Sequence, residues 1–326
     1  MTTSGTTNYS ETRTQIIESM YEIIGVKSIG FELTTEDSTK ASNALNRMLA
    51  HWNVSGPHLW KYDEGILFLQ PHQNKYKIGN AASDDVACLK DDLVLTQING
   101  ALAAGVATLV VDSTAGMTAN DYIGIVLTDK TVQWTTIDSI TNATTLVLDT
   151  VLSGAVSDNA YIYTFTNKLY KPFEIFKKTC RCITGIRSST LSTLQANYMK
   201  DFNYREFQSF VDVDSTPQPT LSGYNYLPQN TNGIFWAYPT PSDGAYRIQF
   251  SFKKQLEDMI DSSDTIDLPK EWLEPIIWQL AVRMIPVYSK FERAEYVNGI
   301  ASSMLKNLKS SDQEFGDIQF TPGEDW

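Results

Sequence analysis

The sequence has little cysteine, little histidine and no long apolar run among its 326 residues. Its three cysteines are an odd and sparse set, which argues against a disulfide framework and fits a reducing compartment. No stretch approaches the roughly 18 consecutive apolar residues of a membrane-spanning helix. The polar, uncharged start at 1–7 predicts that there is no secretory signal. We therefore expect a soluble protein with no membrane partner.

Positive charge is also in the minority. Lysine and arginine number 26 against 38 aspartates and glutamates, which gives a formal net charge of −12. Binding to DNA or RNA through bulk charge requires basic residues that displace counterions, so the composition argues against a protein that grips nucleic acid. The aromatic fraction of 11% and the length predict two or three folded units, each with a substantial core.

Residues able to perform catalysis or to bind metals occur without a recognisable motif. The histidines have no Ser/His/Asp context, and Cys180-x-Cys182 is one residue short of a CxxC pair. The acidic clusters lack the spacing of a calcium loop, although a hydrolase with a carboxylate pair stays an alternative. We predict no enzyme activity, no catalytic residue, no cofactor and no metal site. The residues considered are His51, His58, His72, Asp84-Asp85, Asp91-Asp92, Asp261, Asp264 and Asp267.

Helices are predicted at both ends of the chain. Apolar residues at helical spacing predict one helix over Ser10–Ile24, and Thr34 with Asp37 forms a capping-box pattern at the start of a second. Near the other end, Trp272–Ile285 and residues 290–308 predict two more helices. Helices of this length cannot bury an apolar face alone, so we predict that the N- and C-terminal pairs form one bundle.

The middle of the chain has the period of β-strands. Residues 100–165 are poor in lysine and arginine, and their short strand patterns follow one another closely, which predicts an inserted small β barrel or sandwich. The fold class is therefore α+β, with a helical bundle, a β-rich middle and an inserted domain. The expected divisions are 1–60 (N-terminal helices), 61–99 and 166–254 (β region), 100–165 (inserted domain), 255–309 (C-terminal helices) and 310–326 (extended arm).

The aromatic residues of the β region leave an alternative function open. Tryptophan and tyrosine side chains can form a platform for sugars, although they more often serve as core or protein interface. A glycan- or receptor-binding tail protein is therefore the leading alternative from another class.

Five segments in order resemble the head-to-tail adaptor proteins of short-tailed bacteriophages, which are also described as head-completion, connector or tail-tubular-A-like proteins. Each segment alone is mostly an apolar pattern with turns, and it is their order and spacing along most of the chain that carry the resemblance. They are TRTQII followed by IIGV (Thr12–Val26), ALNRMLAHW (Ala44–Trp52), IFWAYPTP (Ile234–Pro241), IDLPKEW (Ile266–Trp272) and LAVRMIPVY (Leu280–Tyr288).

The resemblance implies a structural virion protein at the head–tail junction, made in the host cytoplasm. It implies a homo-oligomeric ring, commonly a dodecamer, between the portal protein and a tail nozzle or tubular protein. Such a ring forms part of the genome-ejection channel, through which double-stranded DNA passes without specific binding. The unit at 100–165 looks like an insertion carried by some of these adaptors.

The last residues predict a docking arm. Residues 310–326 have no helical or strand period, and Gly316, Pro322 and Gly323 would interrupt either. Spaced large apolar groups suit an extended peptide that fits pockets on a partner. The resemblance also implies a C-terminal arm against the portal. The predicted portal-docking residues are Phe315, Ile318, Phe320 and Trp326.

Overall fold

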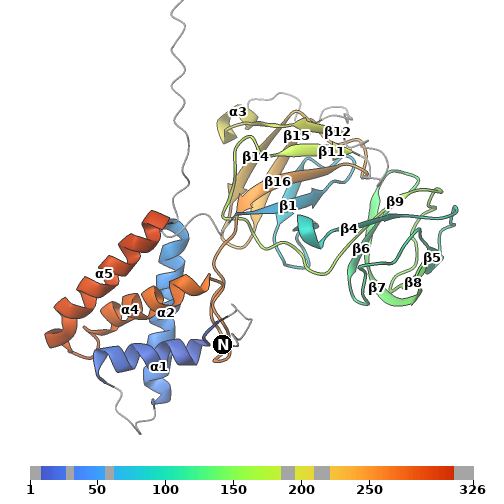
Figure 1. The fold of residues 1–326 in the computed structure, drawn as a ribbon. Helices are drawn as coiled ribbons and strands as arrows, with labels where there is room; N and C mark the ends of the chain where they lie inside the picture. Colours follow the sequence, from blue (N-terminus) through green and yellow to red (C-terminus); the bar gives the residue numbers. More distant parts are fainter. Residues whose placement is uncertain (1–8, 27–32, 56–61, 185–194, 209–220, 312–326) are drawn as a thin grey trace, which may run out of the picture. The chain divides into compact units, whose positions relative to one another are not determined.

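The computed structural model has mixed helix and strand, which confirms the α+β class (Figure 1). It describes residues 9–26, 33–55, 62–184, 195–208 and 221–311. The chain divides into two compact units, one made by residues 1–61 with 255–326 and the other by residues 62–254. Within the described ranges, none of the helices is long and apolar enough to cross a bilayer.

In the described residues of the first unit there are four long helices, drawn from both ends of the chain (Figure 1). They are α1 (Arg13–Ile24), α2 (Thr35–Ser55), α4 (Leu273–Met284) and α5 (Ala294–Ser311). Helix α4 packs against each of the other three, and α1 also packs against α2. One apolar cluster joins them, and Ile16, Leu45, Ile276 and Val297 are fully buried within it.

Capping fixes the ends of α1. The helix begins at Arg13, not at the predicted Ser10, because the Thr12 side chain accepts a hydrogen bond from the Gln15 backbone and the Gln15 side chain bonds the Thr12 backbone. It ends where Gly25 takes a left-handed conformation with φ of 72°. Glycine takes this conformation freely, so the sequence predicts a stop at Gly25, and the structure confirms it.

A proline lies near each end of α4. Pro275 lies in its first turn, where a missing backbone N–H removes no intrahelical bond, so the helix starts before this proline, at Leu273. Pro286 lies two residues after Met284, the last residue of α4, and the chain turns there. Two short 3₁₀ turns precede the helices, η3 (Lys270–Trp272) before α4 and η4 (Phe291–Arg293) before α5.

The second unit is built from three sheets. The first has the order β12-β11-β16-β1-β3 with β10 also on β16, the second is β13-β14-β15-β2, and the third is β4-β9-β6-β7-β8-β5. Two short helical segments, η2 (Lys90–Asp92) and α3 (Tyr204–Gln208), lie between strands. The strands are β1 (Tyr62–Phe68), β2 (Lys75–Ile78), β3 (Ala87–Leu89), β4 (Val94–Gln97), β5 (Thr108–Val110), β6 (Tyr122–Val126), β7 (Val132–Asn142), β8 (Thr145–Leu148), β9 (Tyr161–Phe165), β10 (Glu174–Ile175), β11 (Arg181–Thr184), β12 (Gln195–Tyr198), β13 (Lys200–Asp201), β14 (Gly223–Pro228), β15 (Gly233–Tyr238) and β16 (Arg247–Lys253).

The pattern of Phe173–Thr184 predicts a strand, and the structure divides this range into two short strands. The structure has β10 and β11 with a turn between them, where Lys178 takes a positive φ of 64°. The aromatic-rich range Tyr198–Phe210, for which the sequence predicts some helix, contains the one-turn helix α3, and β12 and β13 precede that helix. Local pattern could not resolve these short elements, because their pairing partners lie elsewhere in the chain.

The third sheet has its own apolar cluster, formed by residues such as Ile123, Ile137 and Ile162. Its strand β4 precedes residue 100, so the sheet extends beyond the predicted inserted segment. Strand β4 pairs with β9 from Val94↔Thr164 to Gln97↔Tyr161, so the chain enters and leaves the third sheet on neighbouring strands. Neighbouring entry and exit strands are compatible with an insertion.

A second cluster joins the third sheet to the first. Phe68 on β1 packs with Trp134 on β7 and with Tyr163 and Phe165 on β9. The Gln70 side chain adds two hydrogen bonds to the Val132 backbone, at 2.7 and 3.0 Å. These contacts make residues 62–254 one compact unit.

Candidate functional site

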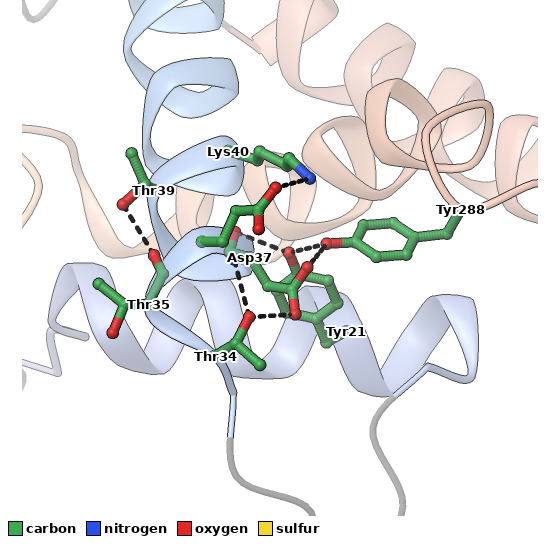
Figure 2. Close-up of polar contacts among 8 residues, drawn as sticks. Tyr21, Thr34, Thr35, Asp37, Thr39, Lys40 and Tyr288 are labelled. Atoms are coloured by element: carbon green, nitrogen blue, oxygen red, sulfur yellow. Dashed lines mark hydrogen bonds and ion pairs between the residues drawn. The ribbon is translucent and has the colours of Figure 1, made fainter.

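Three polar side chains from distant parts of the chain meet in the helical unit (Figure 2). The Tyr288 hydroxyl donates to Asp37 Oδ1 at 2.6 Å, and the Tyr21 hydroxyl donates to the Asp37 backbone carbonyl at 2.9 Å. The two hydroxyl oxygens are 2.8 Å apart. The two hydroxyl groups have two hydrogens for three contacts. At any moment, therefore, one of the three contacts has no hydrogen between its oxygens. The arrangement connects α1, α2 and the turn after α4.

Local capping explains where Asp37 lies. The Thr34 hydroxyl accepts from the Asp37 backbone N–H at 3.1 Å and donates to Asp37 Oδ2 at 2.6 Å (Figure 2). One carboxylate oxygen therefore serves the start of α2, and the other is left to accept from Tyr288. The rings of Tyr21 and Tyr288 pack edge to face, with centroids 5.4 Å apart.

The charge state of this cluster follows from its contacts. Hydrogen bonds from Thr34 and then from Tyr288 lower the pKa of Asp37. Burial raises the pKa of Tyr21, and burial followed by the hydrogen bond to Asp37 raises the pKa of Tyr288. The carboxylate is charged and both phenols are neutral at neutral pH. The cluster therefore acts as a structural clamp between three segments.

We expect Tyr288→Phe to lower the free energy of unfolding of the helical unit by about 1–2 kcal/mol, since it deletes a hydrogen bond to a carboxylate. Urea titration followed by circular dichroism measures this loss. Tyr296→Phe is the matched control, because this α5 tyrosine is 68% exposed. Equal unfolding free energies for the two variants would contradict the role of the clamp.

The raised tyrosine pKa values predict an alkaline dependence. The neutral phenols contribute stability that is complete below the ordinary tyrosine pKa of about 10 and is lost as the pH rises through the raised values. The unfolding free energy of the wild type should therefore fall more steeply above about pH 10 than that of Tyr288→Phe. Parallel slopes in urea titrations at several pH values would show that Tyr288 does not take part.

A second set of contacts holds the chain as it returns to the helical unit. The Asn46 side chain accepts from the Met259 N–H at 3.1 Å and donates to the Met259 carbonyl at 3.2 Å. The Arg13 guanidinium donates to the carbonyls of Met259 and Ile260. The Asn53 side chain accepts from the backbone N–H of Leu256 at 2.8 Å. Helices α1 and α2 thus fix the path that leads into α4.

A groove runs between α4 and α5. One hollow of about 600 Å³ is bordered by Leu305, Lys306 and Lys309, and a second of about 430 Å³ is bordered by Ile285 and Phe291. Both hollows are bordered by Asn298, so they are neighbours along α5, and we refer to them together as the α4–α5 groove. The groove has a basic end and an apolar end, which suits an elongated partner better than a small molecule. Sequence reasoning did not find it, because a groove depends on how two helices pack.

No protein-family model matches this sequence, and no curated protein matches it significantly.

The predicted arm residues lie outside the described part of the chain. This applies to Phe315, Ile318, Phe320 and Trp326, and also to His58. The described chain ends at Ser311, the last residue of α5, one half-turn beyond Lys309 in the groove. The last described residues of α5 therefore lie beside the basic end of the groove.

Two of the acids singled out in the sequence, Asp84 and Asp264, accept hydrogen bonds within turns. Asp84 accepts from the Ala81 N–H and from the Asn232 side chain, each close to 3 Å. Asp264 accepts from two successive backbone N–H groups, those of Ile260 and Asp261. In the ranges that the structure describes, no group of three His, Cys, Asp or Glu residues could hold a metal ion.

The cysteines are core residues. Cys88, Cys180 and Cys182 are all buried and free. Burial raises the pKa of each thiol, to about 12 for Cys180. A thiol is a good nucleophile only as a thiolate, so this environment disfavours reactivity.

Most of the aromatic β region faces inward. On β15 the side chains alternate, and Phe235 is fully buried between Tyr224 and Phe250, with ring centroids 5.5 and 6.3 Å away. Tyr198 is 66% exposed, and the guanidinium of Arg181 lies over its ring at 5.1 Å. The aromatic residues of this region therefore serve mainly as core.

Proposed function

We propose that the protein is a structural virion component, a head-to-tail adaptor whose subunits form a ring between the portal and the tail. The observation that supports this most is the meeting of helices from opposite ends of the chain in one apolar core. Such a core is what we expect if the terminal helices form the bundle of an adaptor subunit. Its last helix leads directly into the apolar-rich segment that we propose as the portal-docking arm.

The remaining parts fit roles in assembly. Residues 62–254 form the β-rich region, and we propose that the third sheet is an insertion carried on it. The side chains of Asp84 and Asp264 accept hydrogen bonds within turns, and the three thiols are buried in the core. A non-catalytic role in a ring that forms part of the ejection channel is consistent with these contacts.

Negative-stain microscopy of the purified protein, alone and with portal protein, tests the proposal. We expect rings, or discs that cap the portal. Monomers that do not bind the portal protein but are retained on a glycan array would support the glycan- or receptor-binding alternative instead. Substrate turnover that a single Asp or Glu substitution abolishes would support a hydrolase.

We further expect that the assembled ring does not bind duplex DNA tightly. The net charge of −12 is repeated in every subunit, and charges that face a narrow lumen act together because the low-dielectric wall focuses their field. A gel-shift titration at low salt is the strictest measurement, since attraction would be strongest there. A tight complex between ring and duplex would refute this prediction.

A further inference from the structure

The two ends of the α4–α5 groove differ in chemistry. Lys306 and Lys309 border one end, and no carboxylate of the described residues pairs with either. At the other end Phe291 is 64% exposed beside Val282 and Ile285. An occupant that covers the whole groove needs negative charge at one end and apolar side chains at the other. Glu295, which borders the apolar hollow, would repel an acidic segment placed in the reverse direction.

The residues that follow α5 have this order of chemistry. Residues 312–326 include five acids and no lysine or arginine. Three of the acids, Asp312, Glu314 and Asp317, come first with Phe315 among them. Ile318 and Phe320 follow, and the other two acids stand near the end of the segment. The segment starts immediately beyond the basic end of the groove.

The lengths also agree. Phe291 and Lys309 are separated by about 27 Å along the helix axis at 1.5 Å per residue. An extended chain advances about 3.3 Å per residue, so roughly eight residues cover this distance. A segment that reverses direction after Ser311 therefore brings its acids past Lys309 and Lys306, and it brings Phe320 to the level of Phe291.

We infer that residues 312–326 occupy the α4–α5 groove of their own chain in the free subunit. The apolar end of the groove covers Ile318 and Phe320, and the two lysines neutralise the acids before them. This contact goes beyond the proposed portal binding, because the arm has to leave the groove before it reaches another protein. The groove is thus a resting site that competes with docking.

A disulfide trap in the full-length chain tests this inference. Phe291→Cys combined with Phe320→Cys should form a disulfide at least tenfold faster than Tyr296→Cys combined with Phe320→Cys. Tyr296 is the matched position because it is equally exposed, at 68%, but does not border the groove. The native cysteines are buried, so only the introduced pair should react.

Non-reducing gels identify the occupant. Our inference predicts a cross-linked monomer, whereas a cross-linked dimer alone would assign the groove to a second copy and overturn it.

Adding Lys306→Glu and Lys309→Glu should slow the monomer cross-link at least fivefold, while the same charge change at the exposed Lys178 and Lys270 should not. Equal rates for the two cysteine pairs, or no effect of the groove lysines, would also overturn it. Portal capture by the wild type is measured separately and tests the proposed function alone.

Discussion

Leu45→Asp is expected to prevent folding of the helical unit. Leu45 lies on α2, is fully buried and belongs to the cluster that joins helices from both ends of the chain. The substitution removes apolar contacts, which costs about 2–5 kcal/mol by itself for a leucine truncated to alanine. An unpaired buried carboxylate adds a penalty of several kcal/mol, and a typical domain has only about 5–15 kcal/mol of stability in total.

Circular dichroism at the helical minimum and thermal melting measure this effect. Asn43→Asp on the same helix is the matched control, since it introduces the same side chain at an exposed position. We expect near wild-type helicity and melting for this control. If Leu45→Asp keeps a wild-type spectrum and melting temperature, the shared helical core is not what holds the unit together.

The sequence predicted the helices better than the sheets. Apolar spacing and capping residues are local, so α1 and α2 could be located to within a few residues from patterns such as Thr34 with Asp37. Sheet pairing is not local. Strand β1 pairs with β16 from Tyr62↔Lys253 to Phe68↔Arg247, and nothing in either strand identifies the other. The strand pattern therefore predicted a β region without its topology.

The same limit applies to the candidate site. Asp37 was identified as a capping residue, because Thr34 is its near neighbour in the sequence. Its bond to Tyr288 spans 251 positions, so only the folded chain reveals the clamp. Net charge and the acidic, aromatic arm could be read from composition alone. The groove that we assign to that arm required the packing of α4 against α5.

Phe68→Ala is the second substitution with a large expected effect, a loss of about 3–5 kcal/mol in the unfolding free energy of residues 62–254. Phe68 is 2% exposed, and its ring centroid lies 4.9 Å from those of Trp134 and Tyr163 and 5.8 Å from that of Phe165. These three partners belong to the third sheet, whereas Phe68 belongs to the first. The truncation leaves a cavity where the two sheets meet.

Denaturant unfolding with a double-mutant cycle separates this contact from general damage to the core. Phe68→Ala and Trp134→Ala should be non-additive by about 0.5–1.5 kcal/mol, as expected for a direct aromatic pair. Tyr170→Ala is the matched control, because this tyrosine is 62% exposed, and its loss should change stability by no more than about 0.5 kcal/mol.

The effect of Phe68→Ala also decides how residues 100–165 can be removed. If Phe68 contributes as expected, replacing them by a Gly/Ser linker exposes Ile66 and Phe68, and a soluble protein then requires polar residues at both positions. A small, additive loss for Phe68→Ala would instead mean that the third sheet is energetically separate, and the plain linker deletion should then remain folded.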